Sequence, residues 1–218
     1  MIFVGIFGAL AADSWSDTRA ARERETNYLA GLAEDFRENE ADLTAAIQRG
    51  DEVIAAAVVL LDIPAGGGHP AIDSVTALLG RLHRLPTFEP VTKTYDNILG
   101  AGDLLTLRDA GLRSLLAGFQ SQLLLTNLIQ ETQERHLVSS FLPYFMENLD
   151  YVAARRGVWE EAPEVIPSHA ASVTEVLGTM KFRNWVGVRL HWAYDLRRNH
   201  ERMLEAVLEV QTAIRGAS

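Results

Sequence analysis

The first 61 residues of the chain contain no proline, and from Tyr28 onward their apolar side chains recur at three- and four-residue steps. Such spacing places the apolar side chains on one face of a helix. Five positions on this face are separated by seven residues, as in helices that pack at a shallow crossing angle: Leu29, Phe36, Leu43, Gly50 and Ala57. The pattern predicts one nearly unbroken helix from Ile2 to Leu61, with Asn39 as a polar interruption.

Proline and glycine divide residues 63–108 into short pieces. We expect a short amphipathic helix over residues 72–82, an extended linker over residues 86–90 and a helical turn over residues 94–99. Gly102 follows that turn and is expected to help end it, because glycine adopts left-handed backbone angles without strain. These pieces are predicted to form a cap over one end of the long helices.

Two further long helices are predicted after the cap region. The second begins at Asp109, a suitable N-cap, and continues to about Arg155. Pro143 lies inside it and should kink or split it, because proline removes a backbone donor and crowds the preceding turn. A loop is predicted over residues 157–168. The last helix is then expected from about Ala171 to Ile214, with a break near Gly178 and with Val188 and Trp192 on its apolar stripe.

The sequence therefore predicts an all-α fold, since no stretch shows the sustained two-residue alternation of a strand. The expected architecture is an elongated antiparallel helical bundle of three long helices plus short cap helices, with residues 13–218 as a single domain. Charge agrees with this pairing, because residues 13–62 hold twelve acids and five arginines whereas residues 181–202 hold six bases and two acids. Solvated faces explain these charges equally well, because exposed ion pairs contribute only about 0 to 1 kcal/mol each.

Composition excludes several classes of function. The formal net charge of -9 argues against a nucleic-acid partner, because binding to phosphates needs a basic face. The chain has no cysteine, which excludes disulfides, thiolate metal sites and cysteine nucleophiles.

Residues 1–12 carry no charged side chain and continue directly into the first predicted helix. Twelve helical residues rise about 18 Å, whereas the hydrocarbon core of a bilayer is about 30 Å thick. Three interpretations stay open. The segment is part of a transmembrane helix whose upstream half lies outside this sequence, which we favour; or it is a secretory signal peptide; or it is a buried helix end.

Several local patterns together resemble an uncharacterised bacterial family of single-pass, membrane-anchored helical proteins that carry a domain of unknown function. The resemblance covers most of the chain and rests on four patterns: Ala12-Asp13-Ser14-Trp15, Tyr28-Leu29-x-x-Leu32-x-x-Asp35, Thr94-Tyr95-x-x-Ile98-Leu99-x-x-Gly102-x-Leu104-x-x-Leu107-Arg108-Asp109-x-x-Leu112-Arg113, and Phe182-Arg183-Asn184. Members of the family begin with a basic segment and a full-length span, and this sequence shows neither. The resemblance implies no catalytic residue.

The two guides to membrane orientation disagree. Arg19, Arg22 and Arg24 follow the apolar segment and would keep the domain in the cytoplasm by the positive-inside rule. The family resemblance implies a domain on the outer side, and we expect a single-pass inner-membrane protein with its domain in the periplasm. The expected partners are the membrane, through the N-terminal helix, and either another protein or a second copy of the chain.

No catalytic, metal or cofactor motif stands out in the sequence. Glu134-x-His136 lacks the Glu-x-x-His spacing that aims two metal ligands into a helical bundle. His191 and Asp195 lie one helical turn apart, but no nucleophile motif accompanies them and an ordinary surface pair is expected. We therefore predict no catalytic residues, no metal and no cofactor.

Four amide side chains form the candidate site that the sequence offers: Asn39, Gln130, Gln133 and Asn199. If the first helix ends at the height where the second begins, Asn39 and the two glutamines lie at one level of the bundle, and Asn199 on the last helix can reach that level. Three hypotheses stay open, namely a buried amide layer that fixes helix register, a small pocket for a polar ligand, and simple exposure to water.

These observations predict a membrane-anchored, non-enzymatic helical module that acts through protein contacts or senses a signal. The alternative is a soluble helical-bundle protein that binds a ligand or catalyses a reaction at a site without a recognisable motif.

Overall fold

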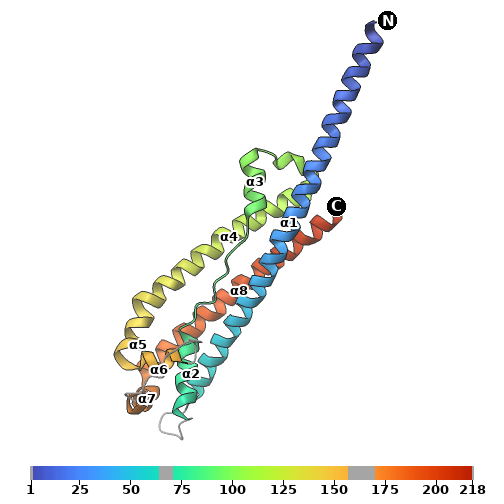
Figure 1. Ribbon diagram of the computed structural model, residues 1–218. Coiled ribbons are helices and arrows are strands. Elements are labelled where there is room, and N and C mark those ends of the chain that lie inside the picture. The colour runs from blue at the N-terminus through green and yellow to red at the C-terminus, as the bar shows by residue number, and fades with distance from the viewer. Residues whose placement is uncertain (1, 64–70, 157–169, 218) are drawn as a thin grey trace. The chain divides into compact units, whose positions relative to one another are not determined.

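The computed structural model describes residues 2–63, 71–156 and 170–217, and throughout these ranges all regular secondary structure is helical (Figure 1). The predicted all-α class is confirmed. The first helix, α1 (Ile2–Asp62), runs without interruption over 61 residues, as expected. The five heptad-spaced residues of its predicted stripe are all buried. The predicted loop over residues 157–168 lies outside the described residues, as do the glycines at positions 66–68.

Four further helices begin and end close to their predicted bounds: α2 (Ile72–Leu82), α3 (Lys93–Ala101), α7 (Ala170–Leu177) and the long α8 (Met180–Ala217). A 3-10 turn, η1 (Leu104–Thr106), follows α3 and was not predicted. Gly102 ends α3 in the left-handed conformation, with φ at 70°, where a Cβ atom would strain the backbone. Residues 84–92, which connect α2 to α3, have no regular secondary structure and include the predicted extended linker.

The second long rod begins and breaks for the predicted reasons. The Asp109 carboxylate caps α4 (Ala110–His136), because its Oδ1 accepts the N–H groups of Gly111 at 2.7 Å and Leu112 at 3.1 Å. A π-helical stretch, η2 (Leu137–Phe141), interrupts the regular helix just before Pro143. The chain then continues as α5 (Leu142–Asn148) and α6 (Tyr151–Arg156).

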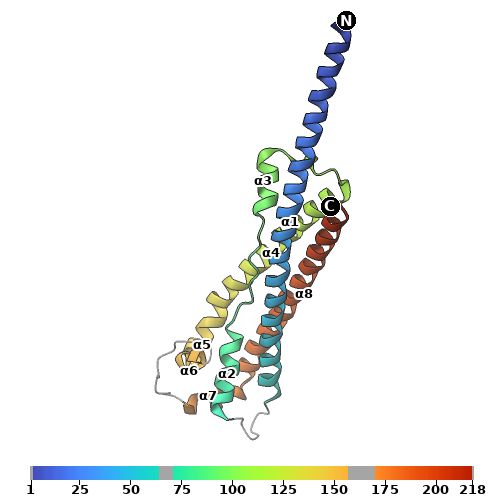
Figure 2. The same ribbon diagram turned by 45° about the vertical axis from the view of Figure 1, so that its right-hand side comes forward.

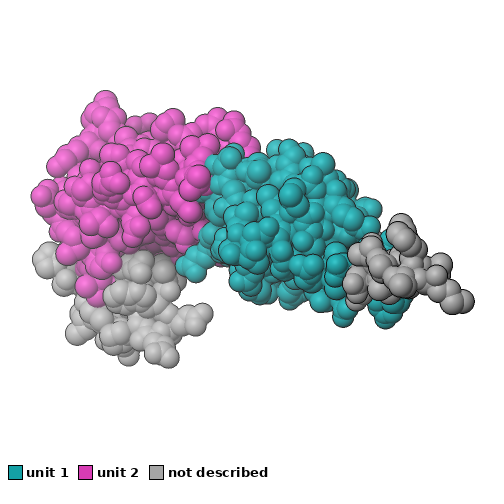
Figure 3. Space-filling model, turned by 90° about the horizontal axis from the view of Figure 1, so that it is seen from above, with its two compact units in different colours: residues 1–42, 89–123, 203–218 teal, residues 43–88, 124–202 magenta. Residues whose placement is uncertain are grey.

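Contacts divide the chain into two compact units, shown in Figure 3. Unit 1 comprises residues 1–42, 89–123 and 203–218. Its core includes the rings of Phe36 and Phe119, whose centroids lie 4.7 Å apart. Asp35 accepts the backbone N–H of Thr94 at 2.7 Å and so fastens the start of α3, which lies beside α1 in both ribbon views (Figures 1 and 2). Further buried apolar residues of this unit are Leu29, Leu32, Ile98, Leu107, Leu116, Val207 and Val210.

Unit 2 comprises residues 43–88 and 124–202 and contains an aromatic core. The rings of Phe141 and Trp185 stack with centroids 3.9 Å apart, and the Trp185 indole N–H donates to the Phe141 carbonyl oxygen at 3.2 Å. The α2 helix lies beside the last turns of α1 in both ribbon views (Figure 2). It closes a cluster with these buried residues: Val53, Ala57, Leu60, Leu79, Leu82, Phe145, Phe182 and Val186.

One part of the predicted stripe of α8 is wrong. Val188 was expected inside but its side chain is 46% exposed, whereas the neighbouring Arg189 is only 1% exposed. The buried face of α8 runs through Val186, Arg189 and Ala193 at three- and four-residue steps. Pattern analysis passed over Arg189 because a charged residue is rarely buried unless its donors find partners.

The first side chains of α1 that the structure describes are exposed. Glu25 is the first described side chain that is buried, and the described side chains before it are exposed except for the half-buried Ala21. No helix of the described residues has a stretch that is both long enough and apolar enough to cross a membrane.

Candidate functional site

Asn39, the first of the four predicted amides, lies in unit 1 and is fully buried. Its Nδ2 donates to the carbonyl oxygen of Val91 at 2.9 Å, and its Oδ1 accepts the Val91 N–H at 2.7 Å. One side chain therefore satisfies both backbone groups of a residue in the extended segment 84–92, as a neighbouring strand would.

Gln130 makes the same kind of contact in unit 2. Its Oε1 accepts the N–H of Phe88 at 2.7 Å, and its Nε2 donates to the Phe88 carbonyl oxygen at 3.2 Å. The imidazole Nε2 of His200 lies 3.2 Å from the same Oε1. Asn39 and Gln130 thus bind backbone of the connecting segment, and neither of these contacts joins two of the predicted amides.

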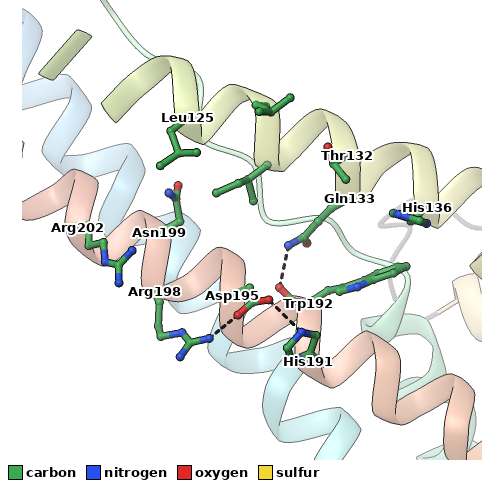
Figure 4. A pocket seen from close by; sticks show the side chains of 12 residues that line it. Leu125, Thr132, Gln133, His136, His191, Trp192, Asp195, Arg198, Asn199 and Arg202 are labelled. Atoms are coloured by element: carbon green, nitrogen blue, oxygen red, sulfur yellow. Dashed lines mark hydrogen bonds and ion pairs between the residues drawn. The ribbon is translucent and has the colours of Figure 1, made fainter. Parts of the chain in front are cut away.

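Gln133 and Asn199 lie in one pocket, between the parts of α4 and α8 that belong to unit 2 (Figure 4). The pocket has a volume of about 610 Å³. Asn199 projects from α8 toward α4, and Gln133 reaches from α4 to the α8 backbone. The residues that line the pocket are Leu125, Leu128, Ile129, Thr132, Gln133, His136, His191, Trp192, Asp195, Arg198, Asn199 and Arg202.

The two amides of the pocket are buried but only partly satisfied. Gln133 is 6% exposed, and its Nε2 donates to the carbonyl oxygen of Trp192 at 2.9 Å, while its Oε1 has no partner in the described part of the chain. Asn199 is 3% exposed, and neither its Oδ1 nor its Nδ2 has a partner among the described residues. Most buried polar atoms in proteins are hydrogen-bonded, so three unpartnered atoms at one pocket require an explanation.

Charged side chains form the outer part of the pocket. The carboxylate of Asp195 binds the guanidinium of Arg198 and lies 3.2 Å from the Nε2 of His191. His191 and Asp195 thus contact each other on one helix, at an exposed and a half-buried position. Within residues 2–63, 71–156 and 170–217, no acidic side chain forms an ion pair with Arg202. Since Arg198 already neutralises Asp195, Arg202 gives this part of the pocket a net positive charge at neutral pH.

The pocket follows from matched spacing on the two helices. The lining residues of α4 and of α8 each recur at helical steps over three turns, so each set occupies a single face. The α4 face mixes apolar and uncharged polar side chains, the α8 face also carries charged ones, and Leu125 and Leu128 are 44% and 58% exposed. Two such faces leave a gap, because they lack the interlocking apolar side chains that fill a core.

The arrangement of side chains is suited to binding. In the described part of the chain, no three histidine, cysteine, aspartate or glutamate side chains are grouped to hold a metal ion. Trp192 packs its ring against His136, with centroids 4.7 Å apart, and so offers an aromatic surface beside the buried amides. These groups can orient and desolvate a small molecule.

Sequence reasoning named the two amides, treated His136, His191 and Asp195 as residues without a site, and missed Thr132, Arg198 and Arg202. Thr132 and Arg202 carry no motif, and Trp192 was assigned to packing in the core. The available signal was the polar character of α8 at positions spaced like its core positions, above all Asn199 between Leu196 and Met203. The three charged residues with the lowest exposure, Asp35, Glu25 and Arg189, serve other contacts and lie outside the pocket.

Comparison of the sequence with protein families, with curated proteins and with solved structures finds no match.

Proposed function

We propose that this chain is a non-enzymatic ligand-binding module that takes up a small molecule in the pocket between α4 and α8. One observation carries the proposal: the Asn199 side chain is 97% buried, faces the pocket and has neither donor nor acceptor partner among the described residues. A sensory role, in which the occupied pocket is the signal, agrees with this chemistry.

In the empty pocket, the unpartnered amide atoms of Asn199 and Gln133 destabilise the folded chain. Burying an amide without hydrogen bonds costs about 1 to 3 kcal/mol. Sites that bind ligands tolerate such local costs because the ligand supplies the missing bonds. A ligand that pairs with Asn199 and with the free Oε1 of Gln133 recovers that cost on binding.

The charged groups of the pocket support binding more than catalysis. The carboxylate of Asp195 is engaged by His191 and Arg198, and neither of these contacts involves a hydroxyl or thiol nucleophile. The only hydroxyl in the lining is that of Thr132. A hydroxyl nucleophile needs an adjacent general base within hydrogen-bond reach, and in the described part of the chain the Thr132 hydroxyl bonds to no such base.

The test is a fragment screen against the full chain, read by ligand-observed NMR and by thermal shift. We expect hits whose binding is lost in Asn199→Leu, a change that keeps the branched shape of the side chain but removes the amide. The matched control is Gln48→Leu, which removes an exposed amide from the same unit and should keep all hits. A screen without hits, or hits that Asn199→Leu binds equally well, contradicts the proposal.

We also propose that α1 attaches the module to a membrane. The support is the uncharged segment over residues 1–12, which is the start of a helix whose first buried described side chain is Glu25. Alkaline carbonate extraction of cells that express the gene with its native upstream DNA tests this idea. Retention of the chain in the membrane pellet supports an anchor, and protease accessibility then gives the side of the membrane. Release into the supernatant contradicts the anchor.

Three finer predictions from the sequence stay predictions. They are the antiparallel bundle, the membership in an uncharacterised family of membrane-anchored proteins, and the protein partner or second copy. The periplasmic location depends on the same family resemblance.

A further inference from the structure

The hydrogen-bonding atoms at the inner end of the pocket define what a ligand must offer. The N–H of Gln133 is fixed by its bond to the Trp192 carbonyl oxygen at 2.9 Å, because the opposite amide orientation would set two oxygens against each other. Gln133 therefore presents an acceptor, Oε1, to the pocket. Asn199 presents one acceptor and one N–H donor group whichever way its amide is turned.

This set of atoms selects against charged groups. A carboxylate can accept from the Asn199 N–H group, but it then meets the two amide oxygens with lone pairs of its own. An ammonium group can donate to both oxygens, but it leaves the Asn199 N–H group unpaired and lies near Arg198 and Arg202. Only an uncharged group that both donates and accepts satisfies all three unpartnered sites.

The other residues that line the pocket indicate the chemistry of the rest of the ligand. Leu125, Leu128 and Ile129 line the α4 side, and the Trp192 ring lies on the α8 side. Apolar and aromatic walls favour an apolar or aromatic body. A volume of about 610 Å³ lies within the range of known small-molecule pockets.

We infer that the pocket binds a small uncharged molecule that carries a primary carboxamide or urea edge on an apolar body. This inference rests on the proposed ligand-binding function. The amide edge pairs with Asn199 and Gln133, and the body packs against the leucines and Trp192.

The experiment compares four probes of similar size in NMR titrations of the full chain: benzamide, phenylurea, benzoate and benzylamine. We expect benzamide and phenylurea to shift the side-chain NH₂ resonances of Asn199 and Gln133. Their Kd should be lower by about tenfold or more than the Kd of benzoate and benzylamine, because each charged probe leaves a buried polar atom unpaired.

A variant designed to prefer a different ligand distinguishes a loss of ligand recognition from a loss of folding. Asn199→Asp replaces the donor group with a second acceptor, so it should weaken benzamide by about tenfold and gain affinity for benzamidine, a cation that only donates. Gln48→Leu should leave all four affinities unchanged. A variant that is simply unfolded would lose every probe and gain none.

The outcomes distinguish the two proposals. Tighter binding of benzoate or benzylamine in the pocket, or amide binding that Asn199→Asp does not alter, overturns the amide inference and leaves the ligand-binding function standing. If none of the four probes and no fragment binds in the pocket, both proposals fail. Asn199 resonances that respond to neither amide probe, while other fragments bind there, overturn the amide inference alone.

Discussion

At the scale of single residues, this protein satisfies buried polar side chains mainly through backbone groups that are distant in sequence. Asn39 and Gln130 each bind both backbone groups of one residue in the extended segment, which therefore needs no neighbouring strand. Arg189 donates to two backbone carbonyl oxygens at the end of α2 and just beyond it. Asn199 departs from this rule, and that contrast is the basis of the proposal that it binds a ligand.

Arg189 should be essential for stability. Its guanidinium donates to the carbonyl oxygens of Leu82, at the end of α2, and of Arg84. Burial lowers the pKa of this guanidinium to about 10, so it stays charged at neutral pH. We expect Arg189→Ala to lower the free energy of unfolding by about 2 to 4 kcal/mol, because it leaves a cavity and two carbonyls without donors.

Urea unfolding monitored by circular dichroism measures this loss. The control is Arg183→Ala, which removes an exposed arginine that donates to a single carbonyl oxygen, that of Leu61. The control should cost less than about 1 kcal/mol. Equal losses in the two variants would mean that burial of Arg189 is unimportant.

Tyr28 should make stability depend on alkaline pH. Its hydroxyl donates to Asp103 Oδ2 at 2.8 Å, and this hydrogen bond is the main reason that the pKa of Tyr28 is raised. A raised pKa in the folded state favours the neutral phenol. The stability from this bond is therefore fully present below the unfolded value of about 10 and is lost as the pH rises through the folded value.

The measurement compares the parent chain with Tyr28→Phe in urea at pH 8, 9.5 and 11. The parent should be more stable at pH 8, and the difference should shrink by pH 11. Tyr194→Phe, at an exposed position, serves as the control. A difference that stays constant across this range would contradict the assignment of the hydrogen bond.

At the scale of helices, local sequence rules gave the elements but not their partners. Proline, glycine and N-cap residues predicted where α2, α3, α4 and α8 begin or end, because those signals act within a few residues. The partners of Asn39 and Gln130 are backbone groups 52 and 42 residues away, and no local pattern encodes them. Local sequence patterns could not predict the pocket either, because it depends on how closely two helix faces pack against each other.

Two helical glycines should respond in opposite ways to the same substitution. A Cβ atom at Gly31 of α1 would lie 2.8 Å from Oγ1 and 2.9 Å from Cγ2 of Thr94, closer than packed atoms allow. A Cβ atom at Gly118 of α4 would meet nothing within 4 Å. We expect Gly118→Ala to stabilise by about 0.5 to 1 kcal/mol through helix propensity, and Gly31→Ala to destabilise despite that gain.

Thermal melts of both variants and of Thr94→Ala complete the test. The double variant with alanine at positions 31 and 94 should recover most of the loss, because removing Oγ1 and Cγ2 clears the overlap. If Gly31→Ala melts at or above the parent temperature, α1 and α3 are not in close contact at this point.

At the scale of the whole molecule, the chain passes between the two units four times. Three of the passages lie inside the helices α1, α4 and α8, and the fourth lies in the extended segment 84–92. A helix that loses the packing along half its length is only marginally stable in water. The units should therefore unfold in a single transition.

Leu32→Ala tests this coupling, because Leu32 is fully buried in unit 1. The change should cost about 2 to 5 kcal/mol. In a background with Trp15→Phe and Trp159→Phe, tryptophan emission reports only on Trp185 and Trp192 of unit 2. That signal should melt at the same lowered temperature as the overall helical signal. Two separate transitions would contradict a single cooperative unit.

The interleaved path of the chain also has a genetic consequence. Because each unit is assembled from separate stretches of sequence, no continuous piece of the gene encodes either one. A recombination breakpoint between residues 43 and 202 would divide both units at once, so over most of the coding region the two units cannot be exchanged separately. A fusion or deletion library made from this gene should therefore yield folded products only when both units are kept whole.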